Sequence, residues 1–187
     1  RRGRHDRGRR VRPIWQNTPR MNPFLADLLD QPTALRNAVN HYDAAALAGI
    51  RAGSFDRIVI AAMGGSHFAG YPAWLALAQS GLPVWHVEAG ELLHNASALI
   101  NRRTLLWLTS QSGRSAEILA LLDQVVPGQL LALTNDPANP LAECANAVHL
   151  LNAGTEAVVS TKTYVNTLAV SQLMALQLAG KPIDAAR

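Results

Sequence analysis

The sequence predicts an α/β protein: a three-layer αβα sandwich built around about five parallel strands. Short apolar runs alternate with helical patterns along most of the chain, which is typical of crossover units in a parallel sheet. Runs such as Ile58-Val59-Ile60 and Leu105-Leu106-Trp107-Leu108 are apolar on both faces, as expected of strands that helices cover on both sides. The 187 residues, 49% of them hydrophobic, suffice for one domain with a sizeable core.

The individual elements follow from local patterns. Asn22-Pro23 predicts a helix through Leu28, because proline is tolerated in a first helical turn. Gln31-Pro32-Thr33 predicts a second helix, on which apolar residues recur at helical spacing as far as Tyr42. Strands are expected after these helices, at residues 57–62, 83–88, 104–109, 129–134 and 147–151. Further helices are expected between and after the strands, at residues 68–77, 115–125, 139–145 and 161–178, with a short helix or turn at residues 91–96.

The positive charge of the chain is concentrated in its first twenty residues. The whole chain carries a net charge of +4, but residues 1–20 alone hold eight arginines and one aspartate. A segment with so few apolar residues cannot bury enough surface to fold by itself. We interpret residues 1–20 as an Arg-rich disordered tail or a non-native leader ahead of Met21. Because the remaining chain shows no basic stripe, we expect no nucleic-acid partner.

Composition excludes several further classes of protein. Cys144 is the only cysteine, which excludes an internal disulfide and a cysteine-ligated zinc site. Its position in a short helical pattern predicts a small core residue. The six histidines include no helical pair suited to a metal, so we expect neither a metal nor a cofactor. No apolar run reaches the roughly 18 residues of a membrane span, so we expect a cytoplasmic protein without a membrane partner.

The most informative segment, Ser110-Gln111-Ser112-Gly113-Arg114-Ser115, follows the strand expected at residues 104–109. A helix is expected directly after it, and a helix N-terminus leaves backbone N–H groups unpaired. Capping that helix needs one hydroxyl residue, whereas this segment supplies three serines and a glutamine. We therefore predict that this segment, which we call the serine loop, binds a phosphate. Its Arg114 is expected to lie in solvent.

A second turn from strand to helix lies at Met63-Gly64-Gly65-Ser66. Two glycines allow a tight turn over the sheet, and they also let backbone N–H groups approach a ligand while Ser66 supplies a hydroxyl. The spacing to Gly70 does not match a dinucleotide fingerprint, and no lysine follows as in a P-loop. The ligand is therefore expected beyond the carboxyl ends of the strands, where both turns lie, and a nucleotide is not expected.

Three motifs together resemble the sugar isomerase (SIS) domain: Gly64-Gly-Ser, Thr109-Ser-Gln-Ser-Gly and Gly154-Thr-Glu-Ala-Val-Val-Ser-Thr-Lys. The resemblance covers about residues 22–180, and in particular the first of two SIS domains in the glucosamine-6-phosphate synthase family. It implies N-terminal helices at residues 21–56 and a flavodoxin-like SIS domain at residues 57–180, without the family's second SIS domain. By position it also implies contacts to a sugar phosphate from Gly64, Gly65, Ser66, Ser110, Gln111, Ser112 and Ser115, with Val158 near the sugar.

The chain departs from the family's pattern in ways that bear on these contacts. At the first turn the family usually has Cys-Gly-Thr-Ser, so Gly65 lacks a threonine hydroxyl and can contribute only its backbone. One residue is missing between Glu156 and Ser160 relative to the usual spacing. Ser160 is expected to cap the last helix. Lys162 opposes the helix dipole there, so it is either exposed or faces an anionic ligand or a partner subunit.

The resemblance implies a phosphorylated sugar or aminosugar as ligand, and pairing with a second SIS domain or with a second copy as a homodimer. The family's catalytic glutamate, lysine and histidine belong to its second SIS domain, so no catalytic residue is identified in this chain. Glu156 is the only carboxylate in a motif that could act as a base. Whether the chain is an enzyme stays open at this point.

Two functions from different classes fit these expectations. One is an incomplete isomerase, aminotransferase or deaminase-like enzyme of fructose 6-phosphate and glucosamine 6-phosphate metabolism. The other is a non-catalytic module that senses phosphosugars. A nucleotide-binding protein of similar fold would be a third, but its glycine fingerprint is missing.

Overall fold

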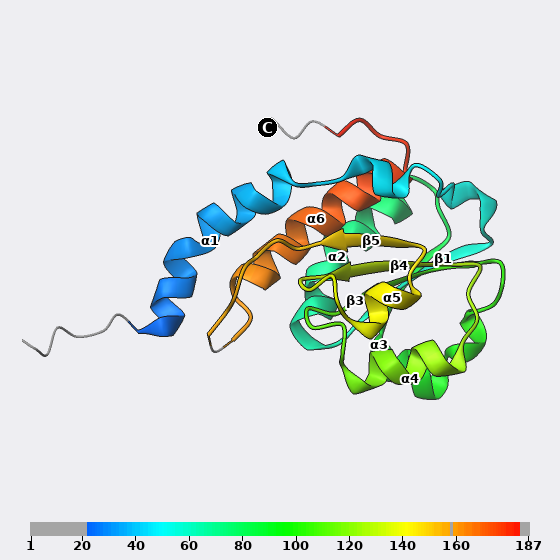
Figure 1. Ribbon diagram of the computed structural model, residues 1–187. Helices are drawn as coiled ribbons and strands as arrows, with labels where there is room; N and C mark the ends of the chain where they lie inside the picture. Colours follow the sequence, from blue (N-terminus) through cyan, green and yellow to red (C-terminus); the bar gives the residue numbers. More distant parts are fainter. Residues whose placement is uncertain (1–21, 158, 184–187) are drawn as a thin grey trace, which may run out of the picture.

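The computed structural model describes residues 22–157 and 159–183, and the interpretation of residues 1–20 therefore lies outside the described chain. Within the described ranges, five strands form one parallel sheet between two layers of helices, which confirms the predicted αβα sandwich (Figure 1). The sheet has the order β2-β1-β3-β4-β5. Its strands are β1 (Arg57–Ala62), β2 (Val84–Glu88), β3 (Thr104–Thr109), β4 (Gln129–Thr134) and β5 (Ala147–Leu150).

The helices divide between the two faces of the sheet. One face is covered by α1 (Pro23–Asn40), α2 (Gly64–Gln79) and α6 (Lys162–Leu178), and the other by α3 (Ala89–Asn95), α4 (Ala116–Gln124) and α5 (Pro140–Cys144). Short 3-10 helices η2 (Ala44–Leu47), η3 (Ala52–Ser54) and η4 (Ser97–Leu99) join these elements. Successive residues of a strand point to opposite faces, so Trp107 packs in the first layer and Leu108 in the second, both fully buried.

Helix α1 is one continuous helix where the sequence predicted two. Its start is as expected, because the Phe24 N–H donates to the side chain of Asn22 at 2.9 Å. Pro32, which was expected to begin a second helix, lies inside α1. A proline inside a helix removes one intrahelical hydrogen bond, and here the packing of α1 along α6 stabilises the helix despite that loss.

Cys144 is exposed at the end of α5, so its prediction as a core residue is wrong. A helix of five residues has room to bury only one side of a single turn, and α5 buries Leu141. None of the helices in the described chain combines the length and the apolar character that a membrane crossing requires.

The buried His149 makes the stability of the fold depend on pH. Its ring stacks on Tyr42 with centroids 5.0 Å apart, and its Nε2 contacts no hydrogen-bond partner within the described ranges. Burial lowers the pKa of His149 to about 4, although Asp43 acts in the opposite direction. The unfolded chain takes up this proton near pH 6.5 and the folded chain does not, so stability is lost as the pH falls from 6.5 towards 4.

We expect the free energy of unfolding, measured by urea denaturation, to fall by roughly 1–2 kcal/mol between pH 7 and pH 5 through His149. His149→Phe keeps a ring against Tyr42 but cannot take up a proton, so its stability should change less over this range. Burial and the neighbouring His67 also lower the pKa of His86 to about 4. His86 therefore accounts for the pH dependence of stability that remains in the variant. Parallel curves for the variant and the parent would contradict the prediction.

Candidate functional site

A pocket of about 260 Å³ opens where the sequence placed its two ligand-binding turns. It lies at the carboxyl ends of β1 and β3, where the chain order of the strands reverses, and parallel α/β proteins bind their ligands at this position. Three segments line it: the first turn of α2, the serine loop, and the connection from β5 to α6. The lining residues are Met63, Gly65, Ser66, Gln111, Glu156, Val159, Ser160 and Thr163.

The glycine turn forms the first turn of α2, because this helix begins at Gly64, four residues earlier than the sequence predicted. Gly64 has a φ of +50°, a conformation that glycine adopts without strain. Gly65 is not required sterically, since an added Cβ would meet only the Tyr164 ring at 3.6 Å. Met63 offers no side-chain cap, so the N–H groups of this turn are available to a ligand.

In the serine loop, the hydroxyl groups also organise the loop itself. Ser110 is buried, and its Oγ accepts the Gly113 N–H at 3.1 Å and pairs with Ser115 Oγ at 3.1 Å. Ser112 Oγ accepts the Arg114 N–H at 3.2 Å. A serine that accepts a hydrogen bond can still donate its own proton. These three serines lie outside the pocket lining, to which the loop contributes the exposed Gln111.

Arg114 is exposed, as the sequence predicted, and its guanidinium donates to the Ala138 carbonyl at 2.8 Å. Val158, which the resemblance placed near the sugar, lies outside the described residues. The structure thus brings Gly65, Ser66 and Gln111 together at one pocket and leaves Gly64, Ser110, Ser112 and Ser115 beside it.

Glu156 caps α6 and is not poised as a base. Its Oε1 accepts the N–H groups of Thr161 and Thr163 at 2.6 and 3.2 Å, and both threonine hydroxyls donate to its carboxylate. Burial raises the pKa of Glu156, but these hydrogen bonds from Thr163 and Thr161 outweigh it and hold the pKa below its usual value. A carboxylate held ionised in this way stabilises the positive end of a helix dipole.

Ser160 does not cap α6, so that prediction is wrong. Its hydroxyl pairs with Thr163 Oγ1, while the charged carboxylate of Glu156 takes the N–H groups of the first turn. Charge-assisted hydrogen bonds are stronger than those of a neutral hydroxyl, which explains why the glutamate occupies this position.

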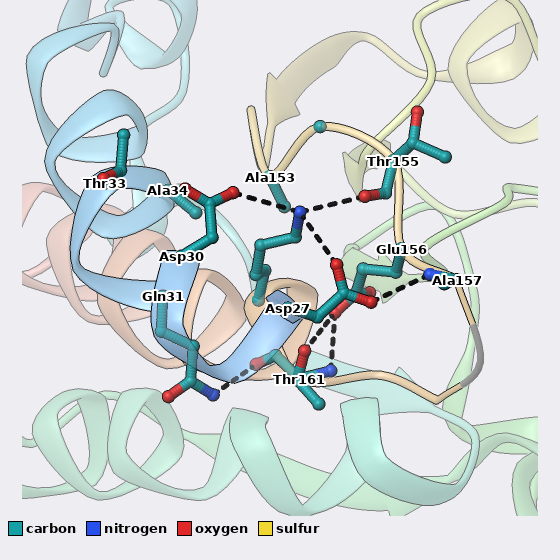
Figure 2. Close-up of polar contacts among 12 residues, drawn as sticks. Asp27, Asp30, Gln31, Thr33, Ala34, Ala153, Thr155, Glu156, Ala157 and Thr161 are labelled. Carbon is teal, nitrogen blue, oxygen red and sulfur yellow. Dashed lines mark hydrogen bonds and ion pairs between the residues drawn. The ribbon is translucent and has the colours of Figure 1, made fainter. Parts of the chain in front are cut away.

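Lys162 is neither exposed nor directed at the pocket, which corrects the expectations of an exposed lysine and of one facing the ligand. Its side chain is only 7% exposed, and Nζ lies 3.2 Å from Asp27 Oδ1 and 3.2 Å from Asp30 Oδ2, both on α1. The same ammonium donates to the Thr155 carbonyl at 2.9 Å (Figure 2). The two carboxylates of α1 therefore compensate a lysine that opposes the dipole of α6.

Two further contacts join α1 to the connection between β5 and α6. Asp27 Oδ2 accepts the Ala157 N–H at 2.9 Å, and Gln31 donates to the Thr161 carbonyl at 3.2 Å (Figure 2). The Ala157 hydrogen bond, with Lys162, lowers the pKa of Asp27 although burial opposes it. Helix α1 thus holds the wall of the pocket that carries Glu156. Sequence reasoning missed Asp27, because nothing local links it to a segment 130 residues away.

The fold and the pocket define a doubly wound α/β domain with a ligand pocket at the carboxyl edge of its sheet. The SIS domain model matches residues 54–177, and the chain belongs to this family. A relative in Chlamydia caviae, glutamine–fructose-6-phosphate aminotransferase, is 32% identical over 168 residues. The match covers 83% of this chain but 27% of that protein, so the chain spans about a quarter of the relative's length.

Solved structures agree with this assignment at the level of the fold. The C-terminal domain of glucosamine-fructose-6-phosphate aminotransferase from Francisella tularensis superposes with a TM-score of 0.77 at 22% identity, over 87% of this chain and 48% of that chain. The NanR protein of Vibrio vulnificus, complexed with ManNAc-6P, superposes with a TM-score of 0.67 at 17% identity, over 83% of this chain and 62% of that one.

Proposed function

We propose that this domain binds a phosphorylated sugar or aminosugar in the pocket at the carboxyl ends of β1 and β3. The observation that carries the proposal is that two helix-starting turns, rich in hydroxyl and amide groups, meet at one pocket. Helix N-termini and neutral hydroxyls are suited to a phosphate that must be released again. Membership of the SIS family, with a neighbouring fold solved in complex with ManNAc-6P, supports the same ligand class.

In this proposal the phosphate is held by the two turns and the sugar extends towards the β5–α6 connection. Ser66 and Gln111 are in place at the pocket, and the backbone of Gly64 and Gly65 presents N–H groups of α2. The proposal also assigns Ser110, Ser112 and Ser115, which lie beside the pocket lining, as phosphate ligands, and it assigns Val158 near the sugar.

We assign the chain to the first SIS domain of an isomerase- or aminotransferase-type enzyme of fructose 6-phosphate and glucosamine 6-phosphate metabolism, working in the cytoplasm. Two observations support this assignment. The chain covers a quarter of the aminotransferase relative, and the only titratable side chain among the described pocket residues, Glu156, is occupied as a cap. A second SIS domain or a second copy of the chain would then supply the catalytic groups.

A non-catalytic phosphosugar sensor is the second candidate, and the same state of Glu156 favours it, because a pocket without a free base binds without turnover. NMR detection of deuterium exchange at C1 and C2 of fructose 6-phosphate tests whether the chain has a catalytic base of its own. Exchange above the protein-free rate that Glu156→Gln abolishes would make Glu156 a base and exclude the sensor.

Fructose 6-phosphate and glucosamine 6-phosphate should raise the melting temperature, and unphosphorylated fructose should not, because only a bound ligand stabilises the native state. Replacing Ser110 and Ser112 together with alanine should weaken binding at least tenfold in calorimetric titration, since each hydrogen bond to a charged group contributes roughly 1.5–3 kcal/mol.

The matched control replaces Ser54 and Ser97 together with alanine. These two serines lie in 3-10 helices before the amino ends of β1 and β3, away from the pocket. This pair should bind like the parent. Equal stabilisation by plain fructose, or an unchanged affinity in the Ser110/Ser112 variant, would refute the phosphate assignment.

A further inference from the structure

The serine loop rests on a connection that lies outside the three motifs described above. This connection runs from the end of β4 to the start of α5, residues 134–139, and two of its side chains, Thr134 and Asn139, are fully buried. Buried polar side chains persist where their hydrogen bonds are satisfied, so the partners of these two residues show what they hold in place.

Thr134 joins this connection to the pocket residue Gln111. Its hydroxyl donates to the Gln111 carbonyl at 3.2 Å, and the next backbone N–H, that of Asn135, donates to the same carbonyl at 3.0 Å. The Gln111 carbonyl thus has two donors from β4 and its extension. The exposed amide side chain of Gln111 reaches the pocket from a backbone fixed at this point.

Asn139 holds Thr134 and also forms the surface on which the loop lies. Its Nδ2 donates to Thr134 Oγ1 at 3.1 Å and to the Asp136 carbonyl, and its Oδ1 accepts the Ala142 N–H at 2.9 Å. Both N–H groups and the oxygen of the amide therefore have partners, and these three hydrogen bonds fix its orientation.

Gly113 lies directly against this amide. It has a φ of +64°, and a Cβ added there would fall 1.8 Å from Asn139 Oδ1. Arg114 adds a contact from the exposed side, through the Ala138 carbonyl. The loop is thus held at Gln111, Gly113 and Arg114 by one short connection.

We propose that Thr134 and Asn139 are positioning residues for the phosphosugar site: they act through the backbone of Gln111 and Gly113 and do not touch the ligand. This inference rests on the proposed function, because it assigns the serine loop to the ligand. A loop that is held in place before binding loses less conformational freedom when the ligand binds, so the ligand binds more tightly.

The test compares two buried threonines whose hydroxyls each accept and donate one hydrogen bond. Thr134 lies at the carboxyl end of β4, beside the loop. Thr104 lies at the amino end of β3, where its Oγ1 accepts the Asn101 N–H at 3.1 Å and donates to the Leu99 carbonyl at 3.0 Å. Replacing either with valine keeps the shape and removes the same two bonds, so both variants should lose similar stability.

Only Thr134→Val should weaken the binding of fructose 6-phosphate, by about tenfold in calorimetric titration, as expected for the loss of one hydrogen bond in a held loop. Thr134→Ser restores the hydroxyl and should bind within about twofold of the parent. If Thr134→Val and Thr104→Val bind alike, or if the serine variant does not recover affinity, the positioning role is wrong.

Amide hydrogen exchange in the serine loop tests the positioning role of Thr134 without any ligand. The amides of Ser110 and Gly113 are hydrogen-bonded, and Thr134→Val should raise their exchange rates about tenfold while Thr104→Val leaves them unchanged. If the parent does not bind fructose 6-phosphate, the proposed function fails, and the exchange rates still decide whether Thr134 holds the loop. Unchanged exchange in Thr134→Val would overturn the inference by itself.

Discussion

Lys162→Met is expected to lower the melting temperature by on the order of 10 °C, measured by circular dichroism at pH 7. The substitution leaves Asp27 and Asp30 without the cation that compensates them, and it removes the contact to the Thr155 carbonyl. Breaking a buried ion pair on one side is far more destabilising than losing an exposed pair. Helix α1 should detach from the β5–α6 connection as a result.

The chain offers a matched control, because its one other lysine, Lys181, is exposed. Lys181→Met makes the same change in charge and composition and should shift the melting temperature by no more than about 1 °C. Adding Asp27→Asn and Asp30→Asn to Lys162→Met removes the uncompensated charges and should restore part of the loss. Equal melting temperatures for the two methionine variants would show that the cluster does not stabilise the fold.

Gly113→Ala is expected to weaken the binding of fructose 6-phosphate about a hundredfold, because the new methyl group cannot fit. Its position falls 1.8 Å from an oxygen of Asn139, whose side chain is fixed by hydrogen bonds on every polar atom. The backbone of the serine loop must therefore move, and we expect a loss of affinity as large as the roughly hundredfold loss of rate that a displacement of about 1 Å causes at a reacting site.

Gly81→Ala separates this clash from the cost of backbone strain. Gly81 has a φ of +78°, close to that of Gly113, but a Cβ there would meet no atom within 4 Å. Gly81→Ala should therefore lower the free energy of unfolding by about 1–2 kcal/mol, because alanine is strained at this φ, and it should leave ligand affinity unchanged. The affinities of Gly113→Ala and Gly81→Ala for fructose 6-phosphate are compared by calorimetric titration. Equal affinities would mean that the serine loop does not depend on its contact with Asn139.

Much of the fold was predictable because its main features depend on local patterns. The bounds of β1, β3 and β4 agree with the predicted runs residue for residue, since a strand covered on both faces is apolar without interruption. The positions of the glycine turn and of the serine loop were also predictable, because each directly follows one of these apolar strands. Their convergence on one pocket follows from the parallel sheet, which brings the carboxyl ends of its strands to one edge.

The roles of single polar side chains could not be predicted, because they depend on partners far away in the sequence. Lys162 is buried only because α1 lies across it, and its partners Asp27 and Asp30 precede it by more than 130 residues. Thr134 and Asn139 belong to a connection that reads as an ordinary polar turn, and only its contact with Gln111 and Gly113 gives it a role.

By itself, the sequence determined the three-layer architecture, the SIS family and the pair of turns at the carboxyl edge of the sheet. These properties rest on hydrophobic periodicity and on short motifs, and both are local in the chain. Only the tertiary structure decided that Glu156 caps α6, that Lys162 joins α6 to α1, and that the serine loop rests on Asn139. The physical reason is that the protonation state and orientation of a polar side chain are set by burial and by hydrogen-bond partners, which exist only once distant segments have packed together.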